Sequence, residues 1–239
     1  GLPLYLLLQL VPAWLRTEGI GLKAIGLFAL IQFPYTWKFL WSPLVDRFAL
    51  PWLGRRRGWM AATQALLLAT IAWCGAISPA GLVAPVVDWI ELVPGAWSLP
   101  VPDWPSVAAF LGHPVTIACF LISILSATQD IALDAYRREL LPEVELGLGN
   151  SVHVNAYRIA GLVPGSLSLI LADHLPWSQV FFITALFMLP GLVMSLAVTE
   201  IVSSGGTPKT LRQAVVEPFH EFVNRSGWRE AALILAFIF

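Results

Sequence analysis

Long apolar segments alternate with short polar ones along the whole chain. The segments expected to cross a bilayer are 22–45, 58–77, 114–135, 149–172 and 178–198, preceded by a shorter apolar run at 1–14. A helix needs roughly 20 apolar residues to cross about 30 Å of bilayer hydrocarbon. The pattern therefore predicts an all-α polytopic membrane protein. The chain begins at Gly1 and ends inside a further apolar run, 231–239, so we expect a fragment cut at both ends.

The composition agrees with this interpretation. Hydrophobic residues make up 57% of the chain and charged residues 12%, and the mean hydropathy is +0.75. A soluble domain carries about 25% charged residues. The net charge of −1 does not favour nucleic-acid binding. Cys74 and Cys119 lie in apolar segments without the spacing of a metal or disulfide framework, so we expect no metal and no cofactor.

Basic residues divide the predicted loops into two sets. Ten Lys and Arg residues fall in 46–57, 136–148 and 199–230. Only Arg16 falls in the other set, which is 15–21, 78–113 and 173–177. The positive-inside rule makes the first set cytoplasmic, and the amino terminus is then cytoplasmic too.

Two of these connections are long. The outer loop 78–113 is rich in Pro and Trp, which suits either an interfacial cover or a gate, and its prolines leave only 86–93 open to a short helix. The segment 199–230 joins a flexible SSGG stretch to an amphipathic pattern, which predicts a cytoplasmic linker with a surface helix. A six-span bundle over 1–198, this linker and a new span starting at 231–239 predict the N-terminal half of a two-bundle transporter.

The segment SATQDIALDAYRREL places two aspartates at the end of an apolar run. Asp130 and Asp134 are four residues apart and share one helix face, with Gln129 beside them. Asp134 lies next to two arginines, which suggests either an interfacial ion pair or a coupling role. Asp130 lies about one turn deeper, and a carboxyl removed from water holds a proton more readily. We therefore predict that Asp130 carries protons and that Asp134 tunes it; the alternative is a static structural pair.

Arg158 lies about nine residues into the span 149–172, which places it near the bilayer midplane. Its planar guanidinium suits a carboxylate or phosphate, so it either binds an anionic substrate or pairs with Asp130. Gly161 and Gly165, on the same face, permit close approach of another helix or of a ligand. The residues expected to bind substrate are Arg158, Gln129, Asn155, Tyr157 and Lys38, although the Lys38 stem is also long enough to snorkel towards water.

The loop SPLVDRFALPWLGRRRGW joins the second and third spans. It places Asp46 and Arg47 at a helix end and Arg55, Arg56 and Arg57 before the next helix. These charges either anchor the topology alone or form a network that locks neighbouring helices in one conformation, which is a gating role.

The residues of this loop resemble the signature of the major facilitator superfamily, an Asp-Arg pair followed by Gly-Arg-Arg. Within that superfamily, WKFLWSPLVDRFALPWLGRRRGWMAATQ, SATQDIALDAYRRELLP and NAYRIAGLVPGSLSLILAD resemble the AmpG-type muropeptide permeases. The resemblance implies import of N-acetylglucosaminyl-anhydromuramyl peptides across the bacterial inner membrane, driven by the proton gradient, as part of peptidoglycan recycling. The expected partners are an anionic muropeptide, protons and the lipid bilayer.

Other functions fit some of the same residues. One alternative is a related transporter of another anion, such as an acetyl-CoA-type carrier; a non-transporting receptor or scaffold is another. An intramembrane prenyltransferase would use the D-x-x-x-D of Asp130 and Asp134 to hold Mg²⁺ for a diphosphate substrate. Such an enzyme needs a second acid-rich motif, which the sequence does not contain, so we expect a transporter and not an enzyme.

Overall fold

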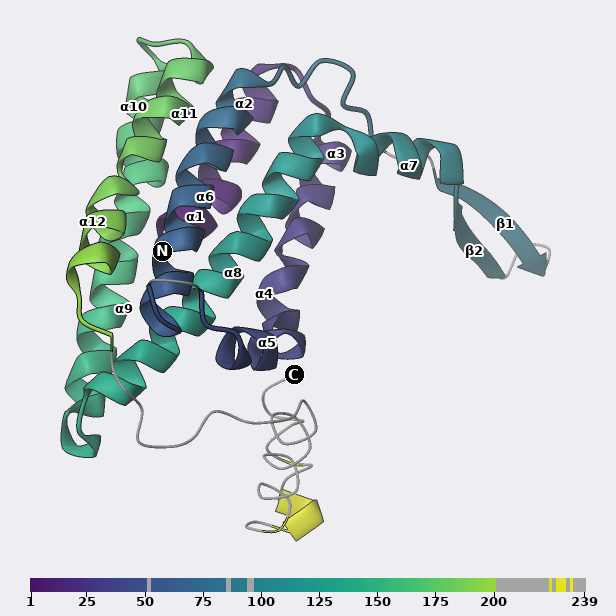
Figure 1. Cartoon of the computed structure of the whole chain (residues 1–239). Helices are drawn as coiled ribbons and strands as arrows, with labels where there is room; N and C mark the ends of the chain where they lie inside the picture. The colour runs from purple at the N-terminus through teal and green to yellow at the C-terminus, as the bar shows by residue number, and fades with distance from the viewer. Residues whose placement is uncertain are drawn as a thin grey trace.

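The protein is a bundle of helices that run roughly side by side (Figure 1). The structure, a computed structural model, describes residues 1–50, 53–84, 87–93, 97–200, 224, 227–230 and 233. Within this part of the chain, four helical runs are long and apolar enough to cross a membrane: Arg56–Ala76, Pro114–Leu140, Glu143–Ala172 and Trp177–Ala197. The all-α polytopic class predicted from the sequence is therefore confirmed.

The four runs are built from one or several elements each. The first two are the single helices α6 and α8, whereas the others contain short irregular turns. The elements are α6 (Arg56–Ala76), α8 (Pro114–Leu140), η4 (Glu143–Glu145), α9 (Leu146–Leu162), η5 (Val163–Leu167), α10 (Ser168–Ala172), α11 (Trp177–Leu186) and α12 (Leu189–Ala197).

The first two apolar segments are broken helices. The predicted span 22–45 is divided because proline lacks an amide donor and its ring clashes with the preceding turn. Pro34 and Pro43 each stand just after a short 3₁₀ turn, and Pro12 follows a π-helical turn. The elements are α1 (Leu2–Tyr5), η1 (Leu6–Leu10), α2 (Val11–Thr17), α3 (Leu22–Leu27), η2 (Phe28–Gln32), α4 (Phe33–Trp37), η3 (Lys38–Leu40) and α5 (Ser42–Arg47).

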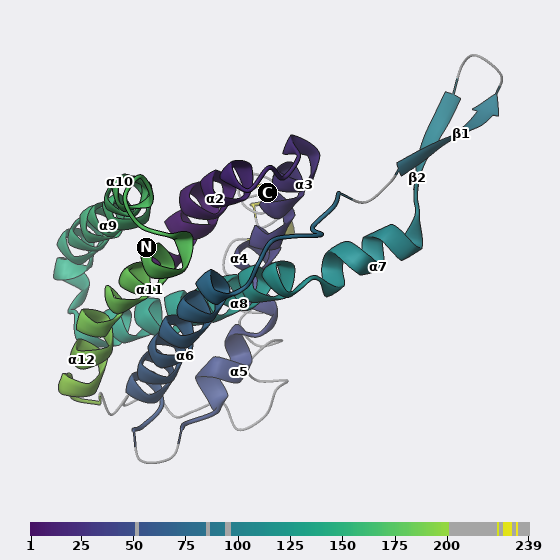
Figure 2. The ribbon, with the colours of Figure 1, turned by 90° about the horizontal axis from the view of Figure 1, so that it is seen from above.

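The core lies where α2, α6, α8 and α11 meet, as the view from above shows (Figure 2). Trp14 of α2 and Phe181 of α11 are almost fully buried, and their ring centroids are 5.0 Å apart in an edge-on contact. Cys74 and Cys119 are buried in the same core as free thiols. The polar residues of α8 and α9 that are discussed below lie outside this core.

The outer loop 78–113 contains a feature that the sequence did not predict. Residues Val87–Val93 form β1, which pairs antiparallel with β2 (Trp97–Pro102), and α7 (Trp104–Gly112) follows. The suggestion of a short helix at 86–93 is therefore wrong, because this β-branched and aromatic stretch pairs with a second strand instead. The hairpin and α7 extend sideways from the bundle (Figures 1 and 2).

The connections gather at the two ends of the bundle. The turns after α5 and after α8 lie at one end, and the turns after α2, α6 and α10 lie at the other (Figure 1). This is the division that the basic residues mark in the sequence. The predicted linker helix within 199–230 and the last apolar run, 231–239, lie almost wholly outside the described residues.

Candidate functional site: a polar cluster and a charged helix end

Asp130 of α8 lies within electrostatic range of several polar side chains from other helices. These side chains are Tyr35, Lys38, His153 and Tyr157. Together with Asp130 these residues come from α4, η3, α8 and α9, and we call them the polar cluster. Ring contacts extend it, since the Tyr157 ring centroid lies 6.2 Å from that of His153 and 5.8 Å from that of Tyr5.

The two aspartates predicted to act together occupy different environments. Asp134 accepts a charged hydrogen bond of 3.1 Å from Arg137, three residues later on α8. Asp130 is half-buried, and no ion pair of this kind holds it within the part of the chain that the structure describes. Asp130 is therefore the aspartate left available to the polar cluster, with Gln129 half-buried beside it.

The predicted substrate residues of α9 lie on an open face. In the most apolar stretch of Glu143–Ala172 only 17% is buried inside the bundle, whereas in that of Pro114–Leu140 the buried share is 56%. Arg158 and Asn155 are both exposed there, and the Asn155 amide donates to the Ser151 carbonyl oxygen at 2.8 Å. No described ion pair joins Arg158 to Asp130, so of the two roles suggested for Arg158 this pairing is not formed.

The glycines that follow Arg158 bring the first helix close. A Cβ atom added to Gly161 would lie 2.6 Å from the Tyr5 ring, and one added to Gly165 would clash with the Gln9 side-chain oxygen. Small residues at such positions let two helix backbones approach. Of the two alternatives drawn from the sequence, close approach of another helix is the one observed.

Four charged side chains meet at the end of the bundle where α5, α6 and α8 come together. Arg56 binds Asp46, and its Nη2 lies 2.7 Å from Glu139 Oε1; Arg55 Nη2 lies 3.2 Å from the same oxygen. We call Asp46, Arg55, Arg56 and Glu139 the arginine network. It joins the end of α5 to the start of α6 and the end of α8.

The other arginines of this loop have different partners. Arg57 donates to the Leu196 carbonyl oxygen of α12, and Arg47 is exposed, with its guanidinium carbon 5.6 Å from the centroid of the Phe48 ring. Glu139, by contrast, was missed in the sequence. Its position in the last turn of α8, on the same side as the basic loop, was the one available signal.

A second carboxylate missed in the sequence, Glu200, caps the start of α6. Its Oε1 accepts the backbone N–H groups of Arg55 and Arg56 at 2.8 and 2.9 Å, and its Oε2 accepts that of Arg57 at 2.9 Å. The first amides of a helix lack partners within the helix and carry partial positive charge, so a carboxylate is a favourable partner. The chain leaving α12 is thereby tied to α6.

The glycine of the Gly-Arg-Arg motif makes this cap possible. Gly54 has a φ of +83°, and an added Cβ would lie 2.6 Å from the carboxyl carbon of Glu200. Gly54→Ala is therefore expected to lower the free energy of unfolding by about 2–3 kcal/mol, from left-handed backbone strain and loss of the cap together. Thermal or denaturant unfolding of the purified protein measures this.

Gly19→Ala is the matched control for that substitution. Gly19 has nearly the same φ, +81°, but nothing lies within 4 Å of an added Cβ, so only the strain of about 1 kcal/mol is expected. If the two substitutions cost the same, Glu200 contributes nothing as a cap. In a Glu200→Ala background the excess cost of Gly54→Ala should vanish.

Comparison with known proteins defines the class to which this fold and these residues belong. Residues 1–162 match the family described as acetyl-coenzyme A transporter 1, a family of major facilitator type, and the chain belongs to it. The chain is similar to the anhydromuropeptide permease of Escherichia coli strain K12, with 37% identity over 239 residues, which cover 99% of this chain and 43% of that protein.

A protein of Haemophilus influenzae described as uncharacterized is 41% identical over 241 residues, which cover 100% of this chain and 50% of that protein. The chain thus spans about half the length of the curated relatives it matches. The resemblance to AmpG-type permeases drawn from the motifs is confirmed, and a transporter family favours transport over the prenyltransferase alternative. Together with the apolar helices, the permease relatives identify a bacterial membrane protein.

Proposed function

We propose that this chain is the N-terminal half of a proton-coupled importer of N-acetylglucosaminyl-anhydromuramyl peptides. The observation that carries the proposal is the 37% identity to an anhydromuropeptide permease over 99% of the chain. The exposed side chain of Arg158 and that of Lys38, which lies within electrostatic range of Asp130, supply cationic groups for the carboxylates of such a substrate. The proposal therefore rests on the similarity to this relative and also assigns roles to specific residues of the chain.

The mechanism we propose is alternating access between two bundles. Residues 1–198 form one bundle, 199–230 the cytoplasmic linker, and 231–239 the start of the second bundle, with the amino terminus in the cytoplasm. Arg158, Lys38, Gln129, Asn155 and Tyr157 bind the substrate. Asp130 accepts a proton, and Asp134 tunes the proton affinity of Asp130. The arginine network, with Arg47 and Arg57 at its edges, stabilises the outward-open state by closing the cytoplasmic end.

An acetyl-CoA-type carrier is the second candidate, because the matching family is described as acetyl-coenzyme A transporter 1. Both candidate substrates are anions, so charge alone does not separate them. The test is uptake of labelled anhydromuropeptide by the natural full-length protein in proteoliposomes with an imposed proton gradient. Uptake that stops when the gradient is collapsed supports the proposal. Uptake of acetyl-CoA that excess muropeptide leaves unchanged would support the carrier instead.

Arg158→Lys is expected to raise the KM for muropeptide by about tenfold with little change in kcat. Lysine keeps the charge but cannot form the two parallel hydrogen bonds that a guanidinium makes to a carboxylate, a loss of about 1.4 kcal/mol. Concentration-dependent uptake measures both constants. Arg138→Lys, also exposed and at the end of α8, is the control and should behave as wild type. An unchanged KM for Arg158→Lys would rule out a bidentate substrate contact.

A further inference from the structure

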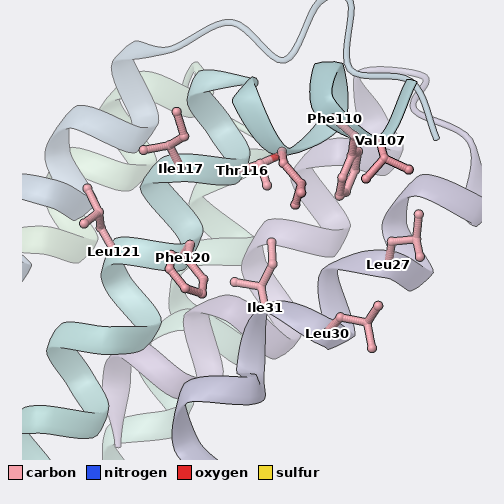
Figure 3. Close-up of a pocket in the computed structure, with 10 residues that line it drawn as sticks. Leu27, Leu30, Ile31, Val107, Phe110, Thr116, Ile117, Phe120 and Leu121 are labelled. Atoms are coloured by element: carbon pink, nitrogen blue, oxygen red, sulfur yellow. The ribbon is translucent and has the colours of Figure 1, made fainter. Parts of the chain in front are cut away.

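An apolar groove runs along the side of the bundle and shares no residue with the polar cluster (Figure 3). Its volume is about 640 Å³, and it lies between the second span, α7 and α8. Leu30, Leu111 and Phe120 line it and remain 65%, 59% and 45% exposed, so the groove is open to the surroundings of the bundle. In a membrane protein those surroundings include lipid.

One polar group interrupts the lining. Thr116, in the first turn of α8, is only 3% exposed, and its hydroxyl has no hydrogen-bond partner among the residues that the structure describes. It lies beside Phe110 and Ile117 in the wall of the groove (Figure 3). A buried hydroxyl without a partner is costly, and a ligand carrying an acceptor would remove that cost.

The cationic side chain of Lys23 belongs to a residue one helical turn before Leu27, which lines the groove. Lys23 and Leu27 are four residues apart on α3 and so share a face, and Leu27 lines the groove. Lys23 is exposed, and no ion pair of Lys23 is present in the described ranges. The structure thus presents an apolar groove with a buried hydroxyl in its wall and a positive charge one helical turn from its lining residue Leu27.

We propose that the groove binds one phospholipid. An acyl chain occupies the apolar lining, an ester carbonyl oxygen accepts the hydrogen bond of the Thr116 hydroxyl, and the phosphate pairs with Lys23. The three kinds of group, a cation, a hydroxyl donor and an apolar lining, correspond to the phosphate, ester and hydrocarbon of the lipid. An apolar helix would also fit the lining, but it would offer no counter-charge to Lys23, which the phosphate of a phospholipid supplies.

The test uses the natural full-length protein in vesicles that contain a phosphatidylglycerol with a photoactivatable diazirine on one acyl chain. After irradiation, peptide mapping by mass spectrometry locates the cross-links. They should concentrate on 27–31 and 107–121. Leu30→Trp, which fills the groove from an exposed position, should reduce them by at least about tenfold. Lys23→Gln should reduce them by roughly fivefold.

Leu66→Trp is the matched control, since Leu66 is 53% exposed on α6 and does not line the groove. It should leave the cross-links at 27–31 and 107–121 unchanged. Equal labelling of every lipid-facing helix, or labelling that Leu30→Trp leaves intact, would show general lipid contact and overturn the proposal. So would an absence of labelling in the groove, together with protection of Leu30→Cys from a membrane-permeant maleimide, because protein would then cover it.

Discussion

Asp130→Asn is expected to abolish accumulation of muropeptide against its gradient, with initial uptake falling to below about a tenth of the wild-type rate. Asparagine keeps the size and shape of the side chain but cannot take up and release a proton. Exchange of labelled for unlabelled substrate requires no net proton movement, so it should continue. Measuring proton-driven uptake and exchange in the same proteoliposomes separates a loss of proton coupling from a loss of substrate transport.

Asp134→Asn provides the comparison for this experiment. Asp134 is bound to Arg137 at the end of α8, whereas Asp130 has no such ion pair within the described ranges. The Asp134 variant should therefore keep most of its proton-driven uptake. If Asp130→Asn accumulates substrate normally, or if Asp134→Asn alone loses accumulation, the proposed proton carrier is the wrong aspartate.

Arg56→Gln is expected to lower the free energy of unfolding by about 3 kcal/mol. The Arg56 side chain is only 7% exposed, and its removal leaves Glu139, which is 19% exposed, and Asp46 without their main cation. Removing one member of a buried pair typically costs 3–5 kcal/mol. The lower end applies because Asp46 is 38% exposed and is partly solvated. Denaturant unfolding followed by circular dichroism measures the change.

Two further variants test whether that cost arises from the arginine network. Arg47→Gln removes an exposed arginine of the same loop and should change stability by less than about 0.5 kcal/mol. Glu139→Gln combined with Arg56→Gln should cost less than the sum of the two single substitutions, because the second change removes an acid that has already lost its contact with Arg56. Strict additivity would contradict a direct contact between Arg56 and Glu139.

The sequence was most informative where the physics is local. The length of each apolar segment is a property of consecutive residues, and it predicted the four long helical runs. The same local pattern did not reveal that the second span is divided, although Pro34 and Pro43 mark the divisions. It also did not reveal the hairpin of β1 and β2, since the pairing of two strands depends on a contact that neither strand contains alone.

By itself, then, the sequence determined an all-α membrane protein with basic residues gathered on one side, and its motifs determined the family. The tertiary structure decided which charges meet. Glu139 binds Arg56 across 83 residues, and Glu200 caps the helix of Arg56 across 144 residues. Among the described residues it also formed no ion pair between Asp130 and Arg158, and it tied Asp134 to Arg137. These pairings depend on how neighbouring helices are rotated and staggered, which the packing of their buried faces sets and no local pattern records.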